Sequence, residues 1–341
     1  MPRLGRPSRQ SILDALDRAK AGLAEVGGLP RSEEAKDIWD GIWQEETHHS
    51  TAIEGNTMVL SQVRALLDEG RAVGNKELTE YLEIQAYAEA AHWVYAQAAQ
   101  GDDWSGREFL NLTELRQIHA LVVEPVWRHF PPSGQHPDEG PGAFRRKDIR
   151  PLASGHTPPA WTDVPALLMD WLAYVNAKDP TIHPMVHLAD AHARFERIHP
   201  FLDGNGRTGR LVLNLLLVRN GYPPAIIYKS QRSEYLKNLR RADKGDPEPL
   251  VEQLARAVKH SIDRFVLPGL AGPNRMVPLT ALASKELSLV SLRRAAQRGR
   301  LQATMRGSLW YSTKKWVDEY RQSRRRGRRK RNDIPSLSEP L

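Results

Sequence analysis

Residues 199–210 read HPFLDGNGRTGR and stand directly before a mostly apolar run at residues 211–218. The backbone N–H groups in the first turn of a helix have no partners within that helix and carry the positive end of its dipole. A Gly-Asn-Gly turn that enters a helix can therefore hold an anion such as a phosphate group. The pattern predicts a buried helix with an anion-binding site at its start.

The ionisable side chains of this stretch favour phosphate chemistry. Arg207 and Arg210 lie three residues apart on one face of the first turn, where guanidinium groups can bind phosphate oxygens in pairs. The carboxylate of Asp203 is an oxygen ligand suited to a Mg²⁺ ion that also binds phosphates. His199 is placed to accept a proton from an incoming hydroxyl group. A plain turn that caps a buried helix would need neither this histidine nor these arginines.

Three other phosphate and metal motifs overlap this stretch and fail on their context. Gly204, Gly206 and Gly209 fit the dinucleotide pattern G-x-G-x-x-G, but no convincing strand precedes them and no suitable acid follows about 20 residues later. Arg210 stands where a P-loop requires Lys, and the following Ser or Thr is missing. A calcium loop counted from Asp203 lacks the carboxylate required at its twelfth position.

The stretch resembles, position for position, the HPFx(D/E)GNGRxxR signature of the Fic family, whose members transfer the AMP of ATP onto a protein hydroxyl group. Supporting similarity runs from about Glu45 to about Leu250. The resemblance implies an all-helical domain with ATP as substrate and Mg²⁺ as cofactor, with His199 as general base and Asp203 as metal ligand. The residues that it implies for phosphate binding are Gly204, Asn205, Gly206, Arg207, Gly209 and Arg210.

A second stretch, STAIEG at residues 50–55, resembles the inhibitory motif (S/T)xxxE(G/N) of Fic proteins. It ends a helix predicted over residues 32–54, with Ser32 as N-cap. Ser50 and Glu54 share a helix face, and a carboxylate at a helix C-terminus is unfavourable unless a cation lies nearby. Arg210 would be that cation, which predicts autoinhibition by Glu54. A solvated glutamate at a helix end is the alternative.

Two more segments are interpreted through the resemblance. Residues 232–239 resemble the helix that lines the adenine pocket in Fic proteins, with Tyr235 and Leu239 as the candidate contacts. The short alternation at residues 143–152 suggests a small β-hairpin, which in the family is a flap that positions the target through main-chain pairing. A plain exposed loop is the alternative for this second segment.

Composition and charge limit the remaining possibilities. The chain of 341 residues has no cysteine, which excludes disulfides and Cys-based zinc sites and fits a reducing cytoplasm. It has neither a run of about 18 apolar residues nor an apolar signal segment, so we expect no membrane partner. Residues 321–331 contain eight Lys and Arg and no acid, which accounts for the net charge of +8.

The segment at residues 268–278 is rich in Pro, Gly and Asn and predicts a domain boundary. The pattern after it predicts, in order, a helix at 279–283, a helix at 288–298, a wing-like pair around 301–311 and a helix from 313. This part resembles the small winged helix-turn-helix units of excisionase and MerR-type proteins. The DNA contacts expected from that resemblance are Arg293, Arg294, Arg298 and Arg300, helped by the basic tail. A protein-docking module is the alternative.

The sequence therefore predicts a mainly α-helical protein that acts as an autoinhibited protein adenylyltransferase in the cytoplasm. Its target would be a Ser, Thr or Tyr hydroxyl group on another protein or on itself, and a homodimer could form through the N-terminal helix. The alternatives are removal of AMP from a modified protein and a nucleotide-sensing, DNA-binding regulator. The predicted parts are a basic segment and helix (1–30), a Fic domain (31–270) with a β-hairpin flap and the inhibitory helix (32–54), a winged-helix module (275–322) and a basic disordered tail (323–341).

Overall fold

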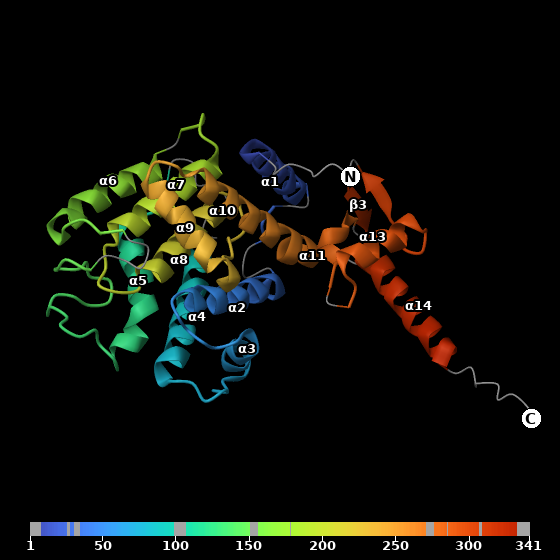
Figure 1. Ribbon diagram of the computed structural model, residues 1–341, viewed down its shortest axis with the longest axis horizontal. Coiled ribbons are helices and arrows are strands. Elements are labelled where there is room, and N and C mark those ends of the chain that lie inside the picture. The colour runs from blue at the N-terminus through green and yellow to red at the C-terminus, as the bar shows by residue number, and fades with distance from the viewer. Residues whose placement is uncertain are drawn as a thin grey trace, which may run out of the picture. The chain divides into compact units, whose positions relative to one another are not determined.

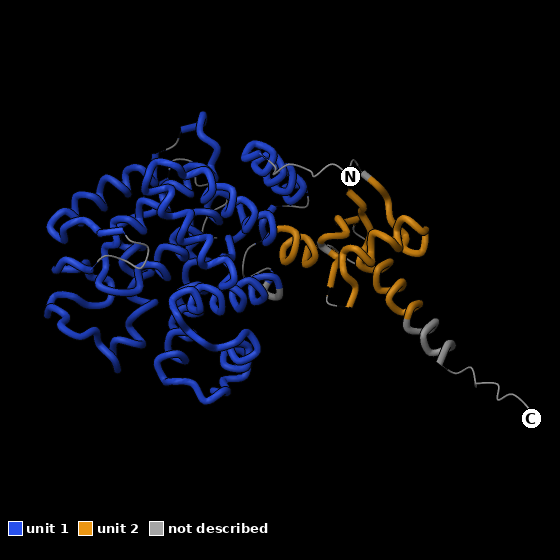
Figure 2. Tube along the Cα trace, viewed as in Figure 1, with its two compact units in different colours: residues 1–261 blue, residues 262–341 orange. Residues whose placement is uncertain are grey.

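The computed structural model describes residues 8–25, 28–30, 35–98, 107–150, 156–177, 179–270, 276–284, 286–306 and 309–332. Over these residues the chain is mostly helical, which confirms the mainly α-helical fold expected from the sequence (Figure 1). It divides into two compact units, residues 1–261 (unit 1) and residues 262–341 (unit 2) (Figure 2). None of the described helices combines the length and apolar character that crossing a membrane requires.

Unit 1 is a bundle of helices around one buried helix. Its helices are α1 (Arg9–Ala24), α2 (Lys36–Ile53), α3 (Leu60–Glu69), α4 (Leu78–Ala98), α5 (Leu112–Trp127), α6 (Val164–Asn176), α7 (Pro184–Ile198), α8 (Asn205–Arg219), α9 (Arg232–Asp243) and α10 (Glu248–Ser261). Helix α8 packs against α4, α5 and α7, and nearly all of its residues are buried. A helix that is apolar on every side is expected to lie inside a domain, which explains the run at residues 211–218.

The connection between α7 and α8 is fixed by local backbone chemistry. His199 ends α7 in the left-handed conformation, with φ 49°, and Gly204 begins α8 with φ 75°. The side chain of Asn205 donates to the carbonyl oxygen of Phe201 at 2.8 Å and accepts from its N–H group at 2.9 Å. These two hydrogen bonds close the turn, so the glycine-rich segment is held rigidly at the start of α8.

Helix α2 begins later than the sequence suggested. It starts at Lys36 with Ala35 as N-cap, and the predicted cap, Ser32, lies outside the described residues. It ends at Ile53, so that Glu54 caps its C-terminus. Helix α2 packs against α3, α4 and α8, which places its last turn next to the glycine-rich segment.

Helix α1 packs its apolar face against α10. Its buried residues are Ile12, Leu13, Leu16 and Leu23, the positions that the helical period selects. That face is therefore occupied within the chain. A homodimer through this helix stays a prediction and would have to use its other face.

The flap predicted at residues 143–152 is a loop over residues 143–150, and residues 151 and 152 lie outside the described part. The N–H group of Arg145 donates to the carbonyl oxygen of Pro200 at 2.9 Å, and that of Arg146 donates to the Glu139 carboxylate at 2.6 Å. These bonds use backbone donors that a hairpin would have paired across its strands. The hydrogen bond to Pro200 attaches this loop to the turn that carries His199.

Unit 2 combines short helices with a small antiparallel sheet. Its elements are a π-helical segment (Ile262–Val266), α11 (Leu267–Leu270), β1 (Val277–Pro278), α12 (Leu279–Leu282), α13 (Leu289–Gln297), β2 (Thr304–Arg306), β3 (Leu309–Ser312) and α14 (Lys314–Asn332). The strand order is β1-β3-β2, with Val277 opposite Ser312 and Met305 opposite Trp310. A core of its own includes Leu279, Leu292 and Val317. Strand β1 was not predicted because two residues are too few to show an alternation.

The first part of the tail predicted to be disordered, residues 323–332, is helical, because α14 continues to Asn332. The hydroxyl group of Thr313 accepts a hydrogen bond from the N–H group of Trp316 at 3.1 Å and starts this helix. Arginine is a good helix former, so a run of basic residues can extend a helix that packing has already started. Residues 333–341 lie outside the described part of the chain.

A buried carboxyl group ties α2 to the rest of unit 1. Glu46 accepts hydrogen bonds from the hydroxyl groups of Tyr87, at 2.9 Å, and Tyr95, and from the side-chain amide of Asn214, at 2.7 Å. Burial raises the pKa of Glu46, while these hydrogen bonds lower it. The cluster joins α2, α4 and α8 through groups that would otherwise be buried without partners.

Replacing Glu46 by Ala should lower the free energy of unfolding by about 3 kcal/mol, because it leaves buried hydroxyl and amide groups without an acceptor. Glu46→Gln keeps the shape and one acceptor and should cost about 1 kcal/mol. Urea unfolding of the full chain, followed by circular dichroism, measures both values. Equal unfolding midpoints for the wild type and Glu46→Ala would show that the cluster does not hold α2 in place.

Candidate active site

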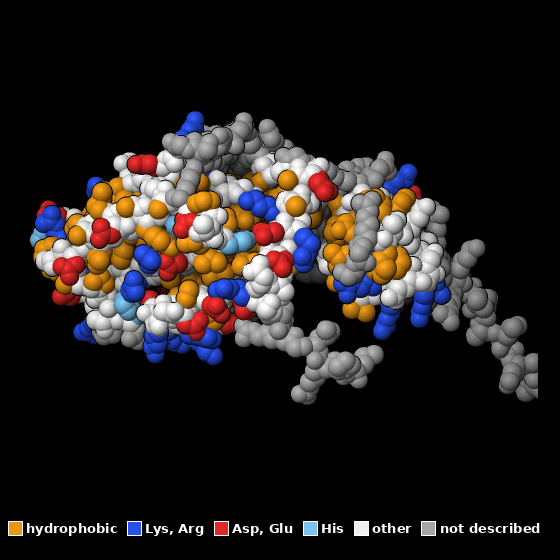
Figure 3. Space-filling view, turned by 90° about the horizontal axis from the view of Figure 1, so that it is seen from above, with side chains coloured by type: hydrophobic (Ala, Val, Ile, Leu, Met, Phe, Trp, Pro, Cys, Tyr) orange, Lys and Arg blue, Asp and Glu red, His pale blue; other side chains and the backbone are white. Residues whose placement is uncertain are grey.

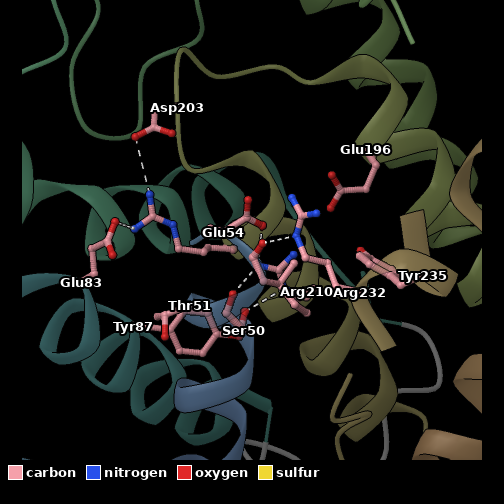
Figure 4. A network of polar contacts seen from close by, with 12 residues as sticks. Ser50, Thr51, Glu54, Glu83, Tyr87, Glu196, Asp203, Arg210, Arg232 and Tyr235 are labelled. Atoms are coloured by element: carbon pink, nitrogen blue, oxygen red, sulfur yellow. Dashed lines mark hydrogen bonds and ion pairs between the residues drawn. The ribbon is translucent and has the colours of Figure 1, made fainter. Parts of the chain in front are cut away.

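A cavity of about 350 Å³ lies in unit 1 where the end of α2 meets α4, α7, α8 and α9. Most of the residues predicted from the sequence line it: Glu54, His199, Asp203, Gly204, Asn205, Gly206, Arg207, Arg210, Tyr235 and Leu239. The residues that line it without having been predicted include Glu83, His156, Glu196, Arg232 and Leu236. Figure 4 shows how the charged groups of this cavity converge.

His199 is held so that one ring nitrogen is available as a base. Its Nδ1 atom lies 3.2 Å from the carbonyl oxygen of Glu196. A carbonyl oxygen can only accept, so Nδ1 carries the proton and Nε2 is left as the acceptor. Burial lowers the pKa of His199 to about 4. The ring is therefore neutral at physiological pH, which a general base requires.

Arg145 was not predicted, and it supports the segment that carries His199. Its side chain is fully buried and donates to the carbonyl oxygens of His199 at 2.9 Å, Lys147 at 3.1 Å and Pro159 at 2.6 Å. The carbonyl group of His199 is thus paired even though this residue has a positive φ, a conformation that is uncommon outside glycine. Arg145 stabilises the backbone geometry from which the imidazole projects.

The glycines of the turn are required by close packing. A Cβ atom on Gly204, which has a positive φ, would come within 2.6 Å of Val123, and one on Gly206 would come within 2.3 Å of the Glu54 carboxylate. Gly209 differs from the prediction, because it does not line the cavity. A Cβ atom there would meet Glu196 at 2.4 Å, so Gly209 allows α7 to approach α8.

Arg207 lies between two carboxylates. Its guanidinium group is 3.4 Å from Glu83 of α4 and 3.6 Å from Asp203. The Asp203 side chain is 57% exposed, whereas that of Arg207 is 7% exposed. Arg207 is thus a buried cation that points toward the glycine-rich turn, and Asp203 remains open to a ligand.

The pair predicted between Glu54 and Arg210 is present. Nη2 of Arg210 lies 2.7 Å from Oε1 of Glu54, while Nε donates to the Ser50 hydroxyl group at 2.7 Å (Figure 4). The same Nη2 donates to the carbonyl oxygen of Ser50 at 2.9 Å. Burial raises the pKa of Glu54, but the charge and the hydrogen bond of Arg210 outweigh it, so the pKa is lowered overall. Glu54 is therefore ionised and occupies an anion site.

Two residues of α9 shape the other end of the cavity. The Tyr235 hydroxyl group is hydrogen-bonded to Nε2 of His192 at 2.7 Å, which fixes the ring against α7. Nε of Arg232 donates to the carbonyl oxygen of Ile53 at 2.6 Å, so the last carbonyl group of α2 gains a cationic partner. Arg232 belongs to the segment 232–239 interpreted from the sequence, but its partner, Ile53, could not be predicted because it is far away along the chain.

The geometry agrees with comparisons to known proteins. Residues 109–217 match the Fic/DOC family. The protein adenylyltransferase Fic of Culex quinquefasciatus is 34% identical over 283 residues, which cover 82% of this chain and 51% of that protein. The solved structure of Fic-1 (residues 134–508) from C. elegans is 27% identical, with a TM-score of 0.62, over 76% of this chain and 72% of that one. A Fic-domain-containing signaling protein from Bacteroides thetaiotaomicron is 23% identical, also with a TM-score of 0.62, over 75% and 95% of the two chains.

The chain thus carries a Fic/DOC domain, and these matches support its assignment to the Fic family. The protein spans about half the length of the curated relatives that it matches. The likeness to the Bacteroides structure concerns the fold.

Proposed function

We propose that this protein is an ATP-dependent protein adenylyltransferase that transfers AMP to a Ser, Thr or Tyr hydroxyl group of a target protein. One observation carries the proposal: a single cavity joins a neutral histidine, with Nε2 available, to an anion site at the start of a helix. The similarity to a protein adenylyltransferase over 82% of the chain supports it.

In the proposed mechanism the phosphates of ATP lie against the N-terminus of α8, where Arg207 and Arg210 balance their charge. Nε2 of His199 accepts the proton of the target hydroxyl group, and the oxygen attacks the α-phosphorus. The bond to the bridging oxygen breaks, pyrophosphate leaves, and the target carries AMP as a phosphodiester. General-base assistance of this kind contributes typically about 10² to 10⁴-fold to the rate.

The residues present fit a Mg²⁺ ion. The carboxylate of Asp203 is exposed in the cavity beside the phosphate site. Within the described residues no group of three or more His, Asp or Glu could hold a metal without other ligands. This donor set suits Mg²⁺, which often takes one or two carboxylates and completes its shell with water and substrate phosphates. Bound there, Mg²⁺ would neutralise phosphate charge during transfer.

We further propose that Glu54 inhibits the resting enzyme. Its carboxylate is bonded to Arg210 at 2.7 Å and lies against Gly206, in the space where a terminal phosphate would meet the start of α8. Two anions cannot share this site, because a second negative charge would be held close to the first without an additional cation. ATP should therefore bind weakly or in an unproductive position while the pair is formed.

In an assay with α-labelled ATP and Mg²⁺, Glu54→Gly should label itself at least about tenfold faster than the wild type, because Arg210 becomes available to phosphate. Adding His199→Ala to Glu54→Gly should reduce this labelling by about 10² to 10⁴-fold, since the general base is removed. Gel autoradiography at saturating ATP measures both rates.

Arg210→Ala is the matched control for this experiment. It also breaks the pair with Glu54, but it removes a phosphate ligand at the same time, so its labelling should stay low, alone or combined with Glu54→Gly. High labelling in Arg210→Ala would mean that loosening α2 is sufficient for activation. Labelling of Glu54→Gly that does not depend on His199 would remove the assignment of the base.

We also propose that unit 2 binds DNA as a winged-helix module. A hollow of about 620 Å³ between α13 and α14 is lined by four arginines and by no carboxylate; the arginines are Arg294, Arg298, Arg300 and Arg324. Ser288 caps α13 at the same hollow, where unpaired N–H groups add to the attraction for an anion. On the face shown in Figure 3, basic side chains gather along one edge of unit 2. The size and charge of the hollow suit the phosphate backbone of a duplex.

Replacing both Arg294 and Arg298 by Ala should weaken binding to duplex DNA and reduce the slope of log K against log[salt] by about 2, because two phosphate contacts are lost. Fluorescence anisotropy with a labelled duplex at several salt concentrations measures this. Arg128→Ala, which removes an exposed arginine from unit 1, should leave the binding unchanged. If the wild type binds no duplex at low salt, the hollow is a protein-docking surface.

A further inference from the structure

Glu83 of α4 lines the active-site cavity, although the mechanism proposed above gives it no role. Its Oε1 atom accepts a hydrogen bond from Nη1 of Arg207 at 3.4 Å. Nη2 of the same guanidinium group is 3.6 Å from Oδ2 of Asp203, which is too long for a hydrogen bond. Figure 4 marks both contacts with dashed lines. Arg207 therefore has two carboxylates within reach, and its hydrogen bond goes to Glu83.

The carboxylate of Glu83 is held in place by a buried amide. Its second oxygen, Oε2, accepts a hydrogen bond from Nδ2 of Asn56 at 3.0 Å. Asn56 is 4% exposed, and the same amide group donates to the carbonyl oxygen of Glu80 at 3.0 Å. The side chain of Glu83 is 22% exposed, whereas that of Asp203 is 57% exposed. An ion pair with a fixed and less exposed carboxylate is screened less and costs less side-chain entropy, so Glu83 is the stronger partner for Arg207.

The alternative partner of Arg207 is the residue that the mechanism assigns to Mg²⁺. An arginine bonded to Asp203 would occupy the oxygen lone pairs that a metal ion needs. The side chain of Arg207 is 7% exposed, and a buried guanidinium group requires an anion. Without Glu83 that anion would be Asp203, because Glu54 is already bonded to Arg210 at 2.7 Å.

We propose that Glu83 is a positioning residue that holds Arg207 away from Asp203 and so keeps the Asp203 carboxylate available to Mg²⁺. This inference rests on the proposed function, since it requires Asp203 to be a metal ligand beside the phosphate site. In this role Glu83 acts through Arg207 and not by contact with the metal ion. A carboxylate on α4 thereby determines whether the metal site on the turn before α8 is open.

Two other roles of Glu83 would also make nucleotide binding depend on it. As a direct ligand or as a nearby negative charge, it would favour Mg²⁺ whether or not Arg207 is present. As a purely structural group, it would support nucleotide binding equally with and without the metal. The proposed role differs from both, because it predicts an effect on the metal that disappears when Arg207 is removed.

The test compares the affinity for ADP at saturating Mg²⁺ with the affinity for ADP in EDTA. Calorimetry on the full chain measures both, at about 0.15 M salt, which screens charges more than about 8 Å apart. ADP lacks the terminal phosphate whose place Glu54 is proposed to hold, and the ratio of the two affinities cancels losses common to both. Glu83→Gln keeps the shape of the side chain and removes its charge. Its ratio should be at least about fivefold below that of the wild type, because Arg207 would then compete with Mg²⁺ for Asp203.

Arg207→Leu shows whether the effect of Glu83 depends on the arginine. This variant should bind ADP more weakly in both conditions, while Arg210 and the N–H groups of α8 still bind phosphate. With no arginine to occupy Asp203, adding Glu83→Gln should change the ratio by less than about twofold. An equal fall of the ratio with and without Arg207 would overturn the inference, because Glu83 would then act as a metal ligand or by its charge alone.

Glu80→Gln is the matched control on α4. It removes the same charge one turn earlier, where the Glu80 carboxylate accepts from the N–H group of Thr57 at 2.6 Å and does not line the cavity. Its ratio should stay within about twofold of the wild-type value. A Glu83→Gln ratio equal to that of the wild type, or loss of ADP binding by Glu83→Gln in both conditions, would show a structural role and overturn the inference.

The same measurements separate this inference from the proposed function. A wild type that binds no ADP, or binds it equally well with and without Mg²⁺, would contradict the proposed nucleotide and metal site, and the inference with it. Binding that depends on Mg²⁺ in the wild type and is indifferent to Glu83→Gln would contradict this inference alone.

Discussion

The ion pair between Glu54 and Arg210 is the interaction on which the geometry of the cavity depends. A guanidinium group that is almost fully buried at the start of α8 requires an anion, because the positive end of the helix dipole destabilises an unpaired cation there. A carboxylate at the end of α2 requires a cation for the opposite reason, because that helix ends in the negative end of its dipole. The pair at 2.7 Å meets both needs. Arg232 and Ser50 add hydrogen bonds between the last turn of α2 and helices α9 and α8. The end of α2 is thereby held inside the site, so the segment that we propose to be inhibitory also forms one wall of the cavity.

The catalytic geometry depends on a second constraint, the backbone between α7 and α8. The chain reverses through His199 and Gly204, both with positive φ, and the side chain of Asn205 closes the turn. Arg145 binds the carbonyl oxygen of His199 from outside, while the carbonyl oxygen of Glu196 selects the tautomer of the imidazole. The acceptor nitrogen and the N–H groups of α8 are thus positioned without a substrate, which would lower the reorganisation needed for the proposed transfer.

The sequence predicted the parts of the site that one continuous stretch or a pair of motifs contains. His199 and Asp203 could be predicted because they belong to one continuous stretch at a helix start, and the Glu54–Arg210 contact could be predicted because residues 50–55 resemble an inhibitory motif of the Fic family. Glu83, Arg145 and Arg232 could not, because each reaches its partner only after distant segments have packed. The hairpin at residues 143–152 was expected from a short alternation of residue types. Two backbone N–H groups that such a hairpin would pair across its strands instead donate to Glu139 and Pro200. The basic tail was expected to be disordered from its composition, which did not reveal that the helix following Thr313 continues through residues 323–332.

Whether Glu54 stands in the place of a terminal phosphate is tested most directly by calorimetric titration of the wild type and Glu54→Gly with ADP and with ATP. If the carboxylate fills only the γ-phosphate position, ADP should bind both proteins with affinities within about twofold of each other, while ATP should bind Glu54→Gly at least about tenfold more tightly. An equal gain for ADP and ATP would contradict this, because it would mean that Glu54 closes the whole cavity. No gain for ATP would mean that the ion pair does not oppose nucleotide binding.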